Sequence, residues 1–311
     1  MKKFAFFLGC NIPIRIPQYA TALTAVCHKF AIELVDIPEF NCCGYPARNV
    51  DEKAYLLPSV RNLAIAEKHG LEILAICNCC FASLRKAARV MADSPGLRAE
   101  FNTLLAKENL HYSGEAKAHH FLAVLHQEVG IATIKAQLTK VFSDLNIALL
   151  YGCHLLRPRQ ITGFDDSFVP KIGEDLLEVT GAASLDWRGK MECCGAALAG
   201  INDTLSQKLL TEKISGAQAA GADFITPVCA YCHLQFDTAQ QHLAAEDPQR
   251  KLLPVLLYPQ LLGLCLGIDH HLLGIEQNST ISPAEIKALS DRLQVPVEKP
   301  KRKQKKAAAT L

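Results

Sequence analysis

The chain has 311 residues, half of them hydrophobic, and a formal net charge of +2. This size and apolar content favour about two globular domains and exclude a disordered chain. Six basic residues crowd positions 299–306, and without them 27 basic residues face 31 acidic ones. The body is therefore mildly acidic, so we expect no nucleic-acid-binding surface, and the basic run is expected to be a solvated, disordered tail.

A cytoplasmic location is expected. The apolar residues 4–8 form a shorter run than the h-region of a secretory signal, which has about 7 to 15 residues. Residues 252–268 are the most apolar segment, but they are interrupted by two prolines and fall short of the roughly 20 residues that span a bilayer. We therefore expect no transmembrane segment there, but a buried loop and helix, with a membrane-contacting surface as the alternative.

The first half alternates strands, cysteine loops and helices. Its pattern predicts strands over residues 4–8, 32–36 and 71–76 and helices over 18–30, 56–69 and 81–91. The first strand ends at Cys10, the second leads into Cys42-Cys43-Gly44, and the third ends at Cys77. Because sites in parallel α/β sheets form at the carboxyl ends of strands, we expect these cysteines to share one edge.

Residues 93–144 contain no cysteine, and their pattern predicts mostly helix. His119, His120 and His126 lie there beside an apolar periodic run. A metal-ligand role stays open, but a surface or helix-packing role is favoured because no cysteine or carboxylate motif accompanies them.

The same order restarts at residue 146. The pattern predicts a strand before Cys153, a helix over 168–180, the Cys193-Cys194-Gly195 loop, a helix over 205–220, a strand over 223–227, a helix opened by Cys229 to Cys232, and a terminal helix over 283–293 capped by Ser282. We therefore predict an α/β fold of two pseudo-repeated halves, each a short parallel sheet with flanking helices, whose cysteine loops face a shared cleft. The predicted boundaries are 1–145, 146–275 and 276–311.

Ten of the 13 cysteines fall into two five-member sets with matched spacing, which is the mark of an internal repeat. The first set is Cys10, Cys42, Cys43, Cys77 and Cys80, and the second is Cys153, Cys193, Cys194, Cys229 and Cys232. Cys27, Cys79 and Cys265 lie outside the sets. Cys27 and Cys265 are expected to be small buried core residues.

Three kinds of site compete for these thiols, because disulfides are disfavoured in the cytoplasm. Structural zinc requires four ligands, whereas each half offers five. A thioredoxin-like dithiol requires one C-x-x-C and leaves the other cysteines unexplained. An iron–sulfur site, held by thiolates from several loops, is favoured. Spacing alone does not identify the type of cluster.

The doubled Cys-Cys-Gly pattern resembles the CCG domain family. The run Gly152-Cys153-His154-Leu155-Leu156-Arg157-Pro158 and residues 258–264 resemble HdrB, the catalytic component of heterodisulfide reductase, and its sulfur-oxidation homologues, so the resemblance covers residues 1 to about 275. It implies a noncubane [4Fe-4S] cluster in each half, ligated by that half's five cysteines. It also implies an oxidoreductase whose disulfide, thiol or persulfide chemistry takes place between the two clusters.

Three residues near the expected ligands have open roles. Cys79 stands inside the first C-x-x-C, where a small residue is expected; it either replaces Cys77 or is not a ligand, and the second is favoured because Cys77 keeps the register of the other half. His154 and Arg157 are candidates for positioning or protonating the sulfur substrate. The alternative for both is support of the cluster loop.

The sequence contains no G-x-G-x-x-G after a strand, no P-loop and no C-x2-C-x2-C-x3-C run, so electrons must come from partners. The resemblance implies a ferredoxin-like HdrC-type subunit, a flavin-bearing HdrA-type subunit, and a disulfide or sulfur-carrier substrate. We therefore expect the catalytic, HdrB-type subunit of a heterodisulfide-reductase-like complex. The rival is an electron-transfer or anchoring subunit, because CCG domains also resemble parts of lactate or glycolate oxidation systems and of succinate or fumarate reductases. A scaffold with a structural cluster is the third possibility.

Overall fold

The computed structural model describes residues 2–247, 249 and 251–296, and the predicted basic tail lies outside these residues. Two parallel sheets organise the chain. The first contains β1 (Lys2–Phe7), β2 (Ile32–Val35), β3 (Glu72–Ala75) and β4 (Ala118–His120) in the order β2-β1-β3-β4, and the second contains β6 (Asn146–Leu150), β7 (Ala183–Ser184) and β8 (Phe224–Pro227) in the order β7-β6-β8. The predicted α/β class with parallel sheets is confirmed.

The two sheets repeat the same pairing. Strand β1 pairs in parallel with β2 and β3, and β6 pairs in parallel with β7 and β8. A parallel bridge between Ile225 and Val255 lies beside β8 just as β4 lies beside β3. The repeat of cysteine spacings is thus a repeat of topology, as predicted.

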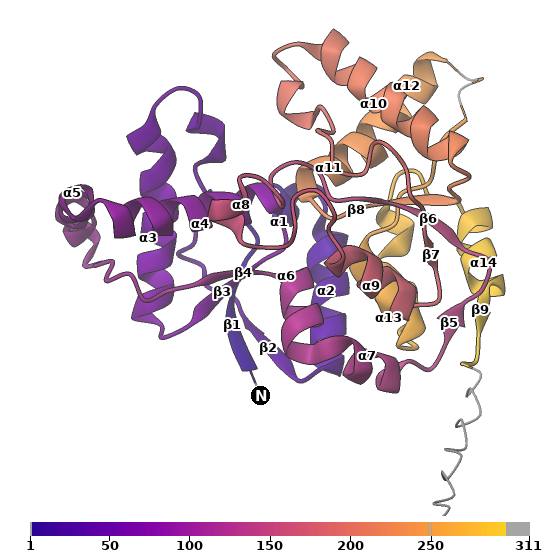
Figure 1. Ribbon diagram of the computed structural model, residues 1–311, viewed down its shortest axis with the longest axis horizontal. Helices are drawn as coiled ribbons and strands as arrows, with labels where there is room; N and C mark the ends of the chain where they lie inside the picture. The colour runs from indigo at the N-terminus through magenta and orange to yellow at the C-terminus, as the bar shows by residue number, and fades with distance from the viewer. Residues whose placement is uncertain (1, 248, 250, 297–311) are drawn as a thin grey trace, which may run out of the picture.

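Helices cover both sheets (Figure 1). The first half carries α1 (Ile12–Arg15), α2 (Pro17–Lys29), α3 (Glu52–Lys68), α4 (Asn78–Asp93), α5 (Pro95–Leu105), α6 (Phe121–Ala123) and α7 (Ile131–Gln137). The second carries α8 (Arg159–Thr162), α9 (Ile172–Val179), α10 (Asp203–Ala219), α11 (Ala230–Leu234), α12 (Gln240–Glu246), α13 (Tyr258–Cys265) and α14 (Pro283–Asp291). Within the described residues, no helix is both long and apolar enough to cross a membrane.

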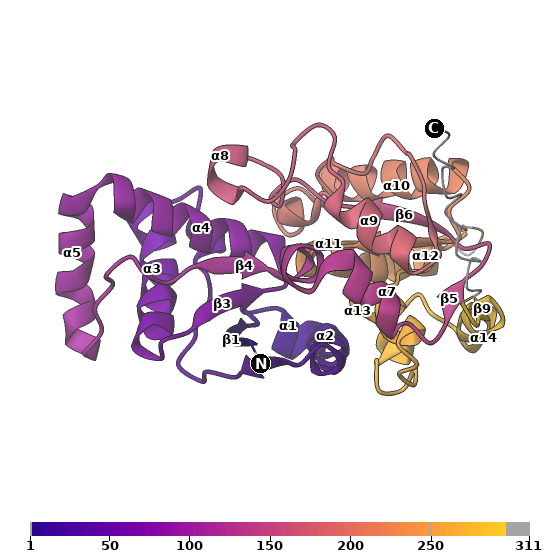
Figure 2. The same cartoon turned by 60° about the horizontal axis from the view of Figure 1, so that its bottom comes forward.

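The halves are joined by one continuous hydrophobic core. Helix α2 of the first half packs against α13 of the second, and α4 packs against α8, as the turned view also shows (Figure 2). Buried amides reinforce this contact, because Gln18 donates to Asn278 at 3.1 Å and Asn278 donates to Gln260 at 2.8 Å. The short strands β5 (Val141–Phe142) and β9 (Leu293–Gln294) pair antiparallel and bring the last described segment back to the link between the halves.

Residues 93–144 are mostly helical, as predicted, because α5, α6, a π-helix (Val124–Gly130) and α7 lie there. The pattern missed β4 and β5, and β4 completes the first sheet beside the buried β3. The helix predicted over 168–180 begins only at Ile172. The carboxylate of Asp166 accepts hydrogen bonds from the backbone N–H groups of Phe168 and Val169, which holds these residues in an exposed turn before Pro170.

His120 makes the stability of the fold sensitive to acid. Its ring is completely buried against Phe81, Phe121 and Phe164, and Nε2 has no hydrogen-bond partner among the described residues. Burial lowers the pKa of His120 to about 3. In the unfolded chain the imidazole of His120 binds a proton near pH 6.5, whereas in the folded chain it stays neutral at that pH. The contribution of the neutral ring to stability is therefore complete above pH 6.5 and is lost as the pH falls below it.

We expect the free energy of unfolding to fall by about 1.4 kcal/mol per pH unit below pH 6.5 on account of His120, or about 2 kcal/mol by pH 5. Denaturant unfolding of the anaerobic protein at pH 7.5 and pH 5 measures this difference. His120→Asn should flatten the dependence, whereas substitution of the exposed His28 by Asn should leave it unchanged. Equal pH dependence in the wild type and His120→Asn would contradict a buried neutral imidazole.

Candidate functional site

Each cysteine set is gathered at the carboxyl ends of its sheet. In the first half Cys10 follows β1 and Cys77 follows β3. In the second half Cys153 follows β6 and Cys229 follows β8. The two C-x-x-C pairs also open helices, since Cys77 is the N-cap residue of α4 and Cys229 that of α11. The partial positive charge of a helix N-terminus favours thiolates at these positions.

The two Cys-Cys-Gly loops have the same backbone conformation. Gly44 and Gly195 both adopt a φ of 84°, a left-handed conformation that glycine adopts without steric cost. A serine hydroxyl from the following long helix holds each loop, because Ser59 donates to the carbonyl of Cys43 at 2.7 Å and Ser206 donates to that of Gly195 at 3.0 Å. This support fixes the directions of the cysteine side chains.

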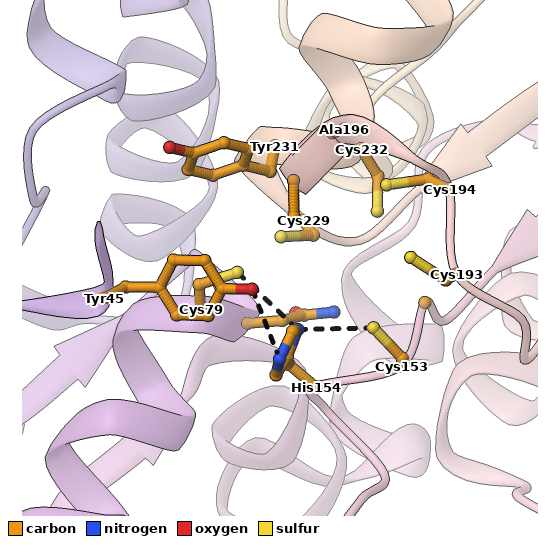
Figure 3. A pocket seen from close by; sticks show the side chains of 13 residues that line it. Tyr45, Cys79, Cys153, His154, Cys193, Cys194, Ala196, Cys229, Tyr231 and Cys232 are labelled. Atoms are coloured by element: carbon orange, nitrogen blue, oxygen red, sulfur yellow. Dashed lines mark hydrogen bonds between the residues drawn. The ribbon is translucent and has the colours of Figure 1, made fainter. Parts of the chain in front are cut away.

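Two adjoining cavities result, each lined by all five cysteines of one set. The cavity of the first half has about 310 Å³ of empty space and is lined by Cys10, Cys42, Cys43, Cys77 and Cys80. The cavity of the second half has about 350 Å³ and is lined by Cys153, Cys193, Cys194, Cys229 and Cys232 (Figure 3). Cys79, Tyr45 and Tyr231 line both cavities. The predicted cysteine sets therefore face a shared region, and Cys79 lies at their junction.

Close contacts between sulfur atoms link the two sets. The Sγ atoms of Cys77 and Cys229 are 3.8 Å apart, and the Sγ atoms of Cys77, Cys79 and Cys229 all lie within 4.8 Å of one another. Asn78 adds a second link between the halves, because its amide donates to the carbonyl of Tyr151 at 2.7 Å. The first C-x-x-C is thus attached to the strand end that precedes Cys153.

Within each set the thiols form the same chain of contacts. Cys42 accepts hydrogen bonds from Cys10 and Cys43, which hold the pKa of the Cys42 thiol below its usual value. Cys193 accepts hydrogen bonds from Cys153 and Cys194 and has a lowered pKa for the same reason. The backbone N–H of Gly195 also donates to Cys193 Sγ at 3.4 Å. Each set therefore contains one site at which negative charge on sulfur is favoured.

His154 lies at the junction of the two cavities. Its other side faces an outer pocket that Arg48 and Arg157 also line. Its Nδ1 atom is 3.3 Å from Cys153 Sγ and 3.8 Å from Cys79 Sγ (Figure 3). Its Nε2 atom is 2.5 Å from Arg48 Nη1 and 3.4 Å from the hydroxyl of Tyr45. Burial of the ring lowers the pKa of His154. A proton on Nδ1 of His154 would therefore point toward the sulfur atoms of Cys153 and Cys79.

Arg157 lies farther from the cysteines. Its guanidinium donates to the carbonyls of Met191 and Ser167, both at 3.3 Å, and so ties the segment after Cys153 to the residues before Cys193. These contacts match the loop-supporting alternative for Arg157. The exposed guanidinium also lines the outer pocket next to His154.

Several residues of the site were missed by sequence reasoning. Tyr45 directly follows the first Cys-Cys-Gly and Tyr231 lies inside the second C-x-x-C, so their positions beside motif residues were a usable signal. Arg48 and Asn78 carried no signal, because their roles depend on contacts with the other half. The three histidines set aside above line neither cysteine cavity: His119 contacts Glu72 at 3.0 Å, His126 contacts Asp175 at 2.9 Å, and His120 is buried among aromatic side chains.

The donor set fits an iron–sulfur cluster in each half. Each cavity offers the five thiols of its own set and the shared thiol of Cys79, and no carboxylate side chain among its described lining residues. Thiolates are the ligands of iron–sulfur clusters, and backbone N–H groups that donate to sulfur adjust their potentials. A closed tetrahedral zinc site would leave one thiol of each set without a role. The donor chemistry therefore agrees with the cluster better than with zinc.

Comparison with known proteins supports the repeat independently. The family model described as "Cysteine-rich domain", CCG, matches residues 4–85 and 147–237. These two segments are the halves that carry the two cysteine sets. The internal repeat found from spacing is thus a repeat of one known domain.

Relatives match nearly the whole chain. The HdrB subunit of a ferredoxin/F420H2-dependent CoB-CoM heterodisulfide reductase from Methanosarcina acetivorans is 35% identical over 284 residues, which cover 90% of this chain and 94% of the relative. The membrane anchor subunit of an 8-methylmenaquinol:fumarate reductase from Wolinella succinogenes is 32% identical, with 89% of this chain and 96% of the relative covered. A crystal structure of a hypothetical protein from Helicobacter pylori shares the fold, with a TM-score of 0.73 at 15% identity, over 91% of this chain and 53% of that chain.

Proposed function

The chain belongs to the cysteine-rich CCG-domain family that includes the HdrB subunit of heterodisulfide reductase, and on this premise we propose that it is the subunit of an oxidoreductase complex in which a disulfide or persulfide and thiols are interconverted. The observation that carries the proposal is the pair of adjoining cavities, each lined by the five cysteines of its own set, with Cys79 at their junction. A disulfide that reaches the junction would contact both halves at once.

We propose that the ten cavity cysteines are the cluster ligands, one [4Fe-4S] cluster of the noncubane type in each half. When bound, the two clusters supply the two electrons that reduction of a disulfide to two thiols requires. The equal sizes of the two sets and their matched chains of sulfur contacts support two equivalent clusters. The domain boundaries near residues 145 and 275 belong to the same proposal.

The protein's own groups would position the substrate and move protons. Each thiol formed from a disulfide takes up one proton, and His154 Nδ1 is oriented toward the sulfur atoms of Cys153 and Cys79. Arg48 and Tyr45 fix the ring from its other side. Arg157 would act by holding the loop, through its two contacts with backbone carbonyls.

Partner subunits belong to the proposal because the chain offers no nucleotide-binding motif of its own. A ferredoxin-like subunit would deliver electrons, and a flavin-bearing subunit would supply that ferredoxin-like subunit. The two most exposed large apolar side chains of the described residues support a partner interface. Val50 is 87% exposed and Ile201 is 83% exposed, and each lies six residues beyond the glycine of a Cys-Cys-Gly loop.

One relative favours a second candidate function. The Wolinella succinogenes protein is named a membrane anchor subunit of a fumarate reductase, and it matches nearly its whole length. A chain of this kind would transfer electrons or attach a partner without acting on sulfur itself. The complete double set of cysteines favours the first function, because it allows a cluster in each half and so the two electrons that a disulfide takes up.

The discriminating experiment is reduction of disulfides by the anaerobically purified chain with reduced viologen as the electron donor. We expect viologen oxidation that depends on added disulfide and stops when the disulfide is consumed, with two thiols formed per disulfide. His154→Asn should slow turnover about 10²-fold, the lower range for a lost proton donor, without loss of iron. Reduction of the chain by viologen, with no further viologen oxidation when a disulfide is added, would favour the electron-transfer function instead.

A further inference from the structure

A loop of the second half carries four possible metal ligands outside the cysteine cavities. The loop lies between α13 and the 3₁₀ helix Ile275–Gln277, and we call residues 269–276 the histidine loop. Its four polar side chains with ligand atoms are Asp269, His270, His271 and Glu276. None of them lines either cysteine cavity. The histidine loop is therefore separate from the two cysteine sets.

Two imidazoles of the histidine loop face the same carboxylate. His271 Nδ1 is 2.5 Å from Glu276 Oε1, and His270 Nδ1 is 3.7 Å from Glu276 Oε2. The two rings lie next to each other, with their centroids 4.0 Å apart. A separation of 3.7 Å is too long for a hydrogen bond, but it suits two ligands of one metal ion, since the ligand atoms of a tetrahedral zinc ion are about 3.3 Å apart.

His270 also has a nitrogen atom that nothing else satisfies. Its Nδ1 atom is screened from solvent and has no hydrogen-bond partner within the described part of the chain. Polar atoms that are shielded from water normally have a partner, and leaving one without a partner costs free energy. A cation held between His270 and Glu276 would remove this cost.

Asp269 adds a second carboxylate to the same place. One ligand atom each from Asp269, His270 and His271 can be chosen so that all three lie within 4.8 Å of one another. Among the residues that the structure describes, no lysine or arginine forms a salt bridge with Asp269 or Glu276. Two imidazoles suit zinc and similar transition metals, whereas calcium takes oxygen ligands. The donor set therefore favours a transition metal.

We propose that the histidine loop binds one divalent transition-metal ion of the zinc type through His270, His271 and Glu276, with Asp269 as the fourth ligand. The two imidazoles supply neutral nitrogen ligands, and the two carboxylates balance the charge of the ion. No residue of a Cys-Cys-Gly or C-x-x-C motif takes part. The site is thus independent of the sulfur chemistry proposed above.

The place of the histidine loop in the fold gives the ion a structural role. Gln18 of helix α2 donates to the carbonyl of Gln277 at 3.4 Å, directly after Glu276. At Gly274, within the loop, a Cβ atom would lie 2.8 Å from the Cβ atom of Gln18, so the backbone of the loop contacts α2 closely. An ion that joins residue 269 to residue 276 would hold the loop against the first half.

Zinc binding by the anaerobically purified, iron-containing chain tests the proposal. Equilibrium dialysis should show one zinc ion retained per chain, without loss of iron. Zinc-edge X-ray absorption should show nitrogen and oxygen neighbours at about 2.0 to 2.1 Å and no sulfur at about 2.3 Å. Zinc with sulfur neighbours only would place the ion on cysteines and overturn the proposal, as would a chain that retains no zinc.

Variants of the histidine loop locate the ion. His270→Gln and His271→Gln should each weaken zinc binding about a hundredfold, because each removes a ligand. The matched control is His126→Gln, which removes another imidazole that contacts a carboxylate, Asp175 at 2.9 Å, outside the loop. It should leave the affinity for zinc unchanged. Equal affinity in the wild type and in both loop variants would overturn the proposal.

Thermal unfolding tests the structural role. Zinc at about a hundredfold excess over its Kd should raise the unfolding midpoint of the wild type by about 4 °C. The double variant His270→Gln/His271→Gln should lose this shift, and His126→Gln should keep it. Because each shift is measured against the same variant without zinc, a general loss of stability does not imitate the result. A shift of equal size in the double variant would contradict binding at the histidine loop.

Discussion

Serine in place of Cys42 or Cys193 is expected to remove about half of the iron and half of the acid-labile sulfide from the anaerobically purified chain. Each residue is the sulfur at the centre of its set, where two neighbouring thiols donate to it. If each half holds its own four-iron cluster, the wild type contains about eight irons and each variant about four, and the double variant contains almost none. Iron and sulfide analysis with EPR of the oxidised and reduced forms measures this directly.

The three cysteines outside the two sets provide the controls for this experiment. Cys27→Ser and Cys265→Ser should keep the full iron content, since both residues are buried in the core away from the cavities. Within the first C-x-x-C, Cys77→Ser should lose iron and Cys79→Ser should retain it. The reverse order would make Cys79 the ligand, and equal iron in Cys42→Ser and the wild type would contradict the assignment of the first set. Zinc without sulfide would refute both clusters.

The sequence predicts the repeat because its signals are local. An apolar run that ends at a cysteine, followed by a helical period, specifies a strand, a loop and a helix, and two copies with equal spacing specify two similar sheets. The same argument fails for residues 118–120, because β4 has only three residues and includes His119 and His120. A strand this short becomes recognisable only when its partner β3 is known.

How the two halves pack together could not be predicted from the sequence, because that packing also depends on partners that are distant in the chain. The contact of 3.8 Å between Cys77 and Cys229 joins residues that are far apart in the chain, and the bond from Asn78 to Tyr151 does so too. These contacts depend on how α2 packs against α13 and α4 against α8. Residues such as Arg48 obtain their role from that packing, so the contact of Arg48 with His154 has no counterpart in any single motif.

Alanine in place of Gly44 is expected to lower the free energy of unfolding by about 3 kcal/mol or more and to deplete the cluster of the first half. The φ of 84° at this position costs a non-glycine residue about 1 to 2 kcal/mol. In addition, a Cβ atom there would lie 2.2 Å from the carbonyl oxygen of Tyr55, which belongs to the backbone of helix α3. Because helical backbone does not yield as a side chain does, the Cys42-Cys43 loop must move instead, and the sulfur atoms move with it.

Two other glycines make this prediction quantitative. At Gly195 the φ is also 84°, but the nearest backbone atom is the carbonyl oxygen of Ser206, 3.0 Å from the Cβ position, so Gly195→Ala should cost less than Gly44→Ala. Gly70 has a φ of 64° and open space around it, so Gly70→Ala should show the cost of the conformation alone, about 1 to 2 kcal/mol. Denaturant unfolding and iron content of the three variants establish the order. If Gly44→Ala and Gly70→Ala lose equal stability and keep equal iron, the close approach of helix α3 does not hold the loop, and the cysteine side chains must be oriented by the cluster itself.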